Sequence, residues 1–264
     1  MKRAIIFFLL FAFLQVLGAA LALLVCKVAA ACSGEAELSA TFRAVSAGRA
    51  QLCFNLVFCA AALWFFHREK TLRLSLESPR KPTLGKFVPA AAVLAFVVFA
   101  VGIDFIASPF LDDDDGQMEL FKNMKDDPLC LLLLCFVGPL TEELVFRKGI
   151  LEGFLRHNLK VWLAVGLSAL LFAIVHGNWA QGIVALPLGA ALGGMFVRTR
   201  NLKICLPAHM ANNILAVVLI RCPEIVEKTD TWSTATNLCV GIPVACAGLV
   251  GILLTLKPSR PAET

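Results

Sequence analysis

The chain has 264 residues, of which 59% are hydrophobic and 16% are charged, with a mean hydropathy of +0.80 and a formal net charge of +5. This composition excludes a disordered chain and argues against a soluble globular domain. The basic residues form no stripe of the kind that binds nucleic acid, so no nucleic-acid partner is expected. Inside hydrocarbon only helices or closed barrels satisfy the backbone, and the apolar runs are continuous rather than alternating. The expected fold class is therefore all-α, a polytopic membrane helix bundle.

About eight transmembrane helices are expected, because several apolar runs approach the ~20 residues that a spanning helix needs. The first run starts like a signal peptide, but it is too long for a signal h-region, so a retained helix is expected. In chain order the predicted spans are 4–30, 50–66, 87–108, 128–147, 161–178, 181–197, 204–221 and 237–256.

The charges of the connecting loops indicate which side of the membrane each loop occupies. Residues 67–86 hold six Lys/Arg and two acids, whereas residues 109–128 hold seven acids and two lysines. Lys/Arg excess marks cytoplasmic loops, and the sides alternate if both termini are cytoplasmic. Arg43 and Arg49, in the predicted outer loop 31–49, fit this pattern poorly. The expected location is multi-pass in a bacterial inner (plasma) membrane.

The fourth predicted span carries two adjacent carboxylates, which are costly in hydrocarbon unless they pair or perform chemistry. Glu143 and Arg147 are four residues apart on one helix face, so they are expected to pair. Glu142 is rotated by about 100° from Glu143, which leaves it available. The alternative for Glu143 and Arg147 is an ordinary salt bridge at the membrane edge.

Two further predicted spans, the fifth and the seventh, also carry polar side chains. If the turn at 156–160 makes the fourth and fifth spans antiparallel about residue 159, Glu142 and His176 lie at equal depth and could hold one water between them. His209 and Asn213 share a face of the seventh span, and both can donate hydrogen bonds to an oxyanion. The alternative is polar contact between packed helices.

These residues form three short motifs in order on three apolar spans. They are Glu142-Glu143-x-x-x-Arg147, Phe172-x-x-x-His176 and His209-x-x-x-Asn213. Over about residues 128–221 the chain resembles the CPBP family of intramembrane endopeptidases (CAAX protease and bacteriocin-processing, also called Abi). The resemblance divides the chain into helices one to three (1–127), a catalytic core of helices four to seven (128–221), and a last helix with a cytoplasmic tail (222–264).

The resemblance also implies a role for each motif residue. Glu142 would activate a water as general base, assisted by His176. His209 and Asn213 would stabilise the tetrahedral oxyanion. The remaining motif residues would support the site or line it, namely Glu143, Arg147 and Phe172.

The sequence also leads to expectations about a metal, about partners and about alternative functions. The family has been described both as metal-dependent and as glutamate-dependent, and this sequence favours no metal because HExxH is absent. If zinc were bound, Glu142, His176 and His209 would be its ligands. The expected partners are the bilayer and a protein or peptide substrate at the membrane. The alternatives are a transporter with a buried proton relay and a non-catalytic immunity or interaction protein.

Overall fold

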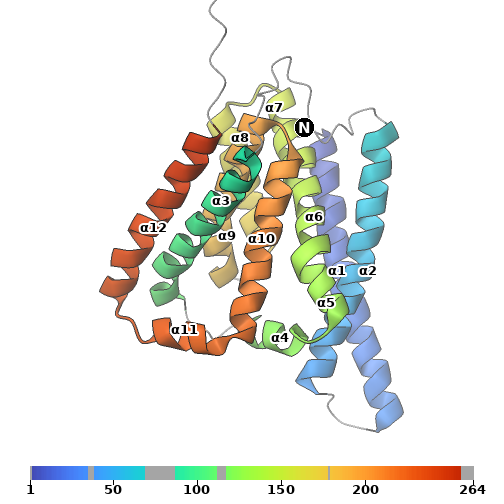
Figure 1. The fold of residues 1–264 in the computed structure, drawn as a ribbon. Helices are drawn as coiled ribbons and strands as arrows, with labels where there is room; N and C mark the ends of the chain where they lie inside the picture. Colours follow the sequence, from blue (N-terminus) through green and yellow to red (C-terminus); the bar gives the residue numbers. More distant parts are fainter. Residues whose placement is uncertain (1, 35–38, 69–86, 112–116, 178, 257–264) are drawn as a thin grey trace, which may run out of the picture.

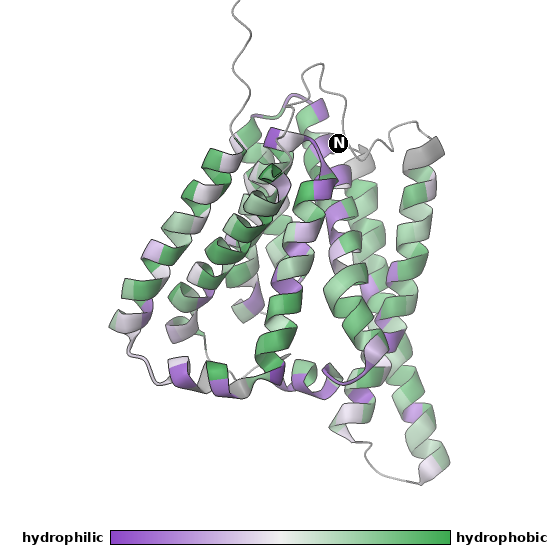
Figure 2. Cartoon of the chain, in the orientation of Figure 1, coloured by the Kyte–Doolittle hydropathy of each residue, from purple (hydrophilic) through white to green (hydrophobic). Residues whose placement is uncertain are grey.

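The computed structural model describes residues 2–34, 39–68, 87–111, 117–177 and 179–256. Within these ranges the chain is a bundle of helices without a β-strand (Figure 1). Seven of the described helices are long and apolar enough to cross a membrane. Figure 2 shows hydrophobic residues along the flanks of these helices and more of the polar residues near the ends of the bundle. The predicted all-α, multi-pass membrane fold is therefore confirmed.

The described helices fall into an N-terminal part, a composite helix and a C-terminal part. The N-terminal part holds α1 (Lys2–Ser33), α2 (Ala40–Arg68), α3 (Val88–Ala107), the 3-10 turn η1 (Ser108–Phe110) and α4 (Gln117–Met124). A composite helix follows, made of α5 (Pro128–Leu132), η3 (Leu133–Val137), α6 (Gly138–Glu142), η4 (Glu143–Leu151) and α7 (Glu152–Arg156). The remaining helices are α8 (Val161–Ile174), α9 (Trp179–Thr199), α10 (Leu202–Arg221), α11 (Pro223–Asp230) and α12 (Thr234–Thr255).

Two predicted spans differ from the helices in the structure. The helix expected over 50–66 begins ten residues earlier, at Ala40, so most of the predicted loop 31–49 is helical. The span expected over 161–178 is a helix of 14 residues, Val161–Ile174. At 1.5 Å per residue this helix rises only about 21 Å, less than the ~30 Å hydrocarbon thickness. As a straight helix it is therefore too short to cross the hydrocarbon by itself.

Arg49, on α2, forms an ion pair with the carboxylate of Asp127, which directly precedes the composite helix. Its NH2 group lies 2.5 Å from Oδ2 of Asp127. Asp127 also caps α5, because its side chain accepts a hydrogen bond from the backbone N–H of Cys130. The ion pair thus joins α2 to α5, which accounts for a basic residue that the loop-charge pattern left unexplained. Most of loop 67–86 and the acidic run 112–115 lie outside the described residues.

This ion pair predicts a pH-dependent contribution to stability. The hydrogen bond from Arg49 lowers the pKa of Asp127 from its ordinary value of 3.8 to about 2. A lowered pKa stabilises the fold above the unfolded value, and this stability is lost as pH falls from about 4 to about 2. Arg49→Ala should therefore lower the thermal midpoint modestly at pH 6, and the gap to wild type should shrink towards pH 2. A gap of equal size at both pH values would contradict this.

The composite helix contains two π-helical segments, in which backbone N–H groups bond five residues back. Gly138 N–H donates to the Leu133 carbonyl in this way, and Glu152 N–H donates to the Arg147 carbonyl. All nine residues of η4 are buried. π-Helical turns inside α-helices frequently occur at functional sites. The widened segment η4 begins at Glu143, directly after Glu142.

Helices α3 and α12 approach each other closely through glycines. A Cβ atom at Gly248 would lie 2.3 Å from the backbone nitrogen of Phe99, and one at Gly102 would lie 2.2 Å from that of Ala245. Small residues at such crossings let helices in a membrane approach closely. Because backbone atoms occupy the space, a side chain here would force the two helices apart.

Gly248→Ala is therefore expected to destabilise the bundle by about 1–3 kcal/mol, the typical cost of overpacking a well-packed interior. The matched control is Gly194→Ala, since nothing lies within 4 Å of a Cβ atom at Gly194. Thermal unfolding of both variants in one detergent would measure the difference. Equal thermal midpoints for the two variants would show that the α3–α12 contact accommodates an added methyl group without loss of stability.

Candidate active site

The two adjacent glutamates lie in different environments at the junction of α6 and η4. The Glu143 side chain is fully buried, whereas that of Glu142 is 24% exposed. Glu142 is the last residue of α6 and Glu143 is the first of η4. The polar cluster therefore has one enclosed carboxylate and one carboxylate at its accessible edge.

Glu143 and Arg147 form the ion pair that their spacing predicts. Arg147 NH1 lies 3.2 Å from Glu143 Oε1, and both side chains are buried. Arg147 NH2 also donates to the carbonyl oxygen of Gly189 at 3.3 Å. The guanidinium carbon lies 4.8 Å from the ring centroid of Phe172, a cation–π distance. Arg147 thus joins η4 to α8 and α9.

His209 lies between the two glutamates. Its Nδ1 is 3.0 Å from Oε1 of Glu143, and its Nε2 is 3.5 Å from Oε2 of Glu142. Both carboxylates reach one imidazole, because α10 packs across the point where α6 changes into η4. Glu143 has two partners, Arg147 and His209.

Asn213 lies one turn beyond His209 on α10, and its amide is already engaged. Asn213 Nδ2 donates to the carbonyl oxygen of Leu134 at 2.9 Å. Leu134 belongs to the π-helical segment η3. This hydrogen bond holds α10 against η3 near the glutamates.

His176 follows the C-terminal end of α8, where Gly177 turns the chain with a positive φ of 67°. Its Nδ1 lies 2.7 Å from the carbonyl oxygen of Phe172, and its ring lies 4.8 Å from the Phe172 ring. Phe172 also contacts the ring of His209, with centroids 5.8 Å apart. Among the described residues no hydrogen bond joins His176 to Glu142. The two imidazoles instead contact the same aromatic ring.

The antiparallel register of the two helices agrees with prediction. Phe146 and Phe172 lie equally far from Leu159 in sequence, and their rings are in contact with centroids 5.2 Å apart. The turn itself lies where it was expected, between the end of α7 at Arg156 and the start of α8 at Val161.

Two residues that position the site could not be assigned from the motifs. Ser168 Oγ donates to the carbonyl oxygen of Phe146 at 2.9 Å and so holds α8 against η4. Gly189 supplies the carbonyl for Arg147, and a Cβ atom there would lie 2.9 Å from the Phe172 ring. The small residues around both positions are a sequence signal for close helix packing, but they do not identify the partners.

The three candidate zinc ligands do not converge. In the part of the chain that the structure describes, no group of three or more His, Cys, Asp or Glu side chains could hold a metal ion together. His209 turns one nitrogen to each glutamate, and His176 is bonded to the backbone of its own helix. A structural or catalytic zinc needs at least three convergent protein ligands. The arrangement in this structure does not fit that metal.

Comparison with known proteins gives a matching family model and similar curated proteins. The family model for type II CAAX prenyl endopeptidase Rce1-like proteins matches residues 125–215. The putative membrane peptidase YdiL of Bacillus subtilis is 27% identical over 151 residues, 57% of each chain. The membrane-embedded CAAX protease MroQ of Staphylococcus aureus is 30% identical over 170 residues, 60% of this chain and 66% of that protein. The chain thus covers less than two thirds of either relative.

No solved structure matches the chain. The matched residues 125–215 contain all three polar motifs, from Glu142 to Asn213. The resemblance to intramembrane CAAX-type endopeptidases that these motifs predict is confirmed, since residues 125–215 of this multi-pass membrane protein match the Rce1-like family model and both relatives are membrane peptidases by name.

Proposed function

We propose that the chain is an intramembrane endopeptidase that hydrolyses a peptide bond in a membrane-associated protein or peptide. The observation that carries the proposal is the position of Glu142. Its carboxylate lies at the accessible edge of a buried polar cluster, 3.5 Å from an imidazole that a second, buried glutamate orients. The names of both relatives, each a membrane peptidase or protease, support the same reaction.

In the proposed reaction Glu142 is the general base. It accepts a proton from a water molecule, whose oxygen then bonds to the carbonyl carbon of the scissile peptide. The protonated Glu142 returns this proton to the leaving nitrogen as the carbon–nitrogen bond breaks. General acid–base catalysis of this kind typically contributes about 10²–10⁴-fold to the rate.

His176 is suited to orient the attacking water. Because the Phe172 carbonyl oxygen can only accept, His176 Nδ1 must carry the hydrogen of the 2.7 Å contact. In the neutral imidazole Nε2 is then the acceptor. A hydrogen bond from water to Nε2 would aim the oxygen lone pair at the substrate and assist Glu142.

His209 and Asn213 are proposed to stabilise the oxyanion. The buried carboxylate of Glu143 orients His209 through Nδ1, so Nε2 lies on the side of Glu142. When both ring nitrogens carry a proton, Glu143 accepts the hydrogen bond from Nδ1–H, and Nε2–H can donate a hydrogen bond to the negative oxygen that forms on the substrate. The Asn213 amide lies one turn away and can add a second donor after it leaves the Leu134 carbonyl. One such donor is typically worth about 10²–10³-fold in kcat.

The proposed route uses no metal, because Glu142, His176 and His209 do not converge as a ligand set. Activity of the reconstituted protein is therefore expected to survive dialysis against EDTA. Loss of cleavage on chelation, with recovery on adding zinc alone, would contradict a metal-free reaction.

The proposed function can be tested without knowing the substrate. Membrane fractions from cells that contain or lack the chain are compared by mass spectrometry of polypeptide amino termini. We expect new internal termini in membrane-associated polypeptides only when the chain is present. If no terminus depends on the chain, and proteoliposomes containing it show proton uptake, the transporter alternative replaces the proposal.

A further inference from the structure

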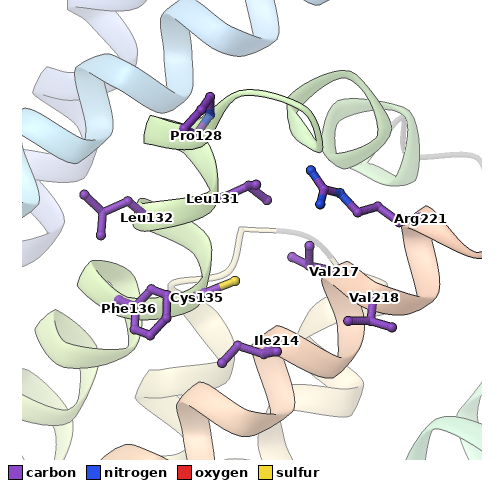
Figure 3. A pocket seen from close by; sticks show the side chains of 9 residues that line it. All are labelled: Pro128, Leu131, Leu132, Cys135, Phe136, Ile214, Val217, Val218 and Arg221. Atoms are coloured by element: carbon purple, nitrogen blue, oxygen red, sulfur yellow. The ribbon is translucent and has the colours of Figure 1, made fainter.

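An apolar groove of about 500 Å³ lies between α5–η3 and the second half of α10 (Figure 3). Both walls belong to the helices that carry the polar motifs, but the groove itself is not part of the polar cluster. Apart from Pro128, a cysteine and an arginine, its lining is made of large apolar side chains. These are Leu131, Leu132, Phe136, Ile214, Val217 and Val218.

The guanidinium group of Arg221 lies at one end of the groove. Arg221, the last residue of α10, donates through Nε and NH2 to the carbonyl oxygen of Lys125, at 3.1 and 2.6 Å. These bonds fix the direction of the guanidinium at the edge of the groove. Its ion pair with Asp126 is long, at 3.6 Å, and both side chains are exposed. Exposed pairs of this kind contribute little, so Arg221 can exchange this partner for another anion.

The same end of the bundle lies at the level expected of lipid headgroups. Helices α4 and α11 run across this end in Figure 1, roughly perpendicular to the spanning helices. Figure 2 shows that both short helices carry polar and hydrophobic residues together. Helices of this kind lie in the interface between hydrocarbon and water. Arg221 is therefore placed where a lipid phosphate would be.

The lining chemistry favours an alkyl chain over an extended peptide. Peptide N–H and C=O groups in such a groove would lack partners, at a cost of several kcal/mol for each group in hydrocarbon. Near its inner end the groove is bordered by the Asn213–Leu134 hydrogen bond, next to the lining residues Ile214 and Cys135. A chain entering from the Arg221 end would therefore stop short of the polar cluster.

We propose that this groove binds a phospholipid of the bilayer, with one acyl chain between η3 and α10 and the phosphate on Arg221. Lipid tails are as apolar as the groove, so burial of the acyl chain alone does not favour a bound lipid over the bulk bilayer. Selection comes from the planar guanidinium, which binds phosphate through paired hydrogen bonds. The proposal is independent of the proteolytic function.

The test uses the full chain in phosphatidylcholine vesicles that contain a small fraction of phosphatidylglycerol with a diazirine on one acyl chain. After irradiation, labelled residues are located by mass spectrometry. We expect labelling of 131–136 and 214–218 well above that of Leu249 and Leu253, which are exposed on α12. Equal labelling of both regions would mean ordinary contact with bulk lipid and would overturn the proposal.

Two pairs of variants separate the headgroup from the chain. Arg221→Gln removes a charge-assisted hydrogen bond and should lower groove labelling about tenfold, whereas Lys203→Gln at the other end of α10 should not. Val217→Trp fills the groove and should abolish labelling there, with Leu249→Trp as control, each checked by its thermal midpoint. If Val217→Trp fails to fold, Leu131→Trp replaces it. Undiminished labelling in Arg221→Gln, or equal labelling by a phosphate-free diacylglycerol probe, would overturn the phosphate contact.

Discussion

Glu142→Gln is expected to lower the cleavage rate by about 10²–10⁴-fold while leaving the protein folded in the membrane. The amide has nearly the shape of the carboxylate and can still accept a hydrogen bond from His209, 3.5 Å away in the wild type. It cannot take a proton from water at neutral pH. The side chain is partly exposed, so neutralising it leaves no buried charge without a partner. Turnover is measured on a substrate found by amino-terminal mass spectrometry.

Two further variants show whether a loss of cleavage is specific. Glu224→Gln changes an exposed carboxylate on α11, outside the three motifs, and should cleave like wild type. Glu142→Asp keeps the base but withdraws it by one methylene, so a partial loss is expected. If Glu142→Gln cleaves as fast as Glu224→Gln, Glu142 is not the base and the proposed mechanism fails.

The parts of the site that were predictable rest on short-range geometry. Helical spacing alone places Glu143 and Arg147 on one face, and they pair at 3.2 Å. Likewise, a single short turn determines the register of its two helices, and the contact of Phe146 with Phe172 agrees with it. Both inferences need only the rise and repeat of a helix.

The contact of His209 with both glutamates could not be predicted in the same way. It depends on how α10 is rotated against the composite helix, and no local spacing determines that rotation. The π-helical segments add to the difficulty, because a change from four to five residues in the hydrogen-bond step shifts every later side chain around the axis. The segment η4, which begins at Glu143, is one of them.

The backbone groups that accept hydrogen bonds from the site residues could not be predicted from the sequence either. The carbonyl groups of Leu134 and Gly189 accept hydrogen bonds from Asn213 and Arg147. Every residue has a carbonyl group, so only the packed structure shows which ones accept a side-chain donor. The start of α2 was also predicted too late in the chain. Its first residues are polar enough to lower the local hydropathy, and the ion pair of Arg49 with Asp127 cannot be seen in a hydropathy profile.

Replacing Arg147 is expected to produce the largest loss of stability in the chain. Arg147→Met leaves the buried Glu143 carboxylate with His209 as its one polar partner among the described residues, and it removes the contacts with the Gly189 carbonyl and the Phe172 ring. Breaking one half of a buried ion pair typically costs about 3–5 kcal/mol. The thermal midpoint in detergent should fall accordingly. A midpoint close to that of wild type would show that water or His209 already compensates Glu143.

The double variant Glu143→Gln/Arg147→Met separates stability from catalysis. With both charges removed, no uncompensated ion remains in the interior, so most of the lost stability should return. Cleavage should remain impaired, because a neutral amide oxygen accepts the hydrogen bond from His209 Nδ1 more weakly than the carboxylate does and so orients the ring less firmly. If the double variant recovers both its midpoint and its activity, Glu143 and Arg147 are only a structural pair. Recovery of the midpoint alone would instead make Glu143 a positioning residue for His209, in addition to its pairing with Arg147.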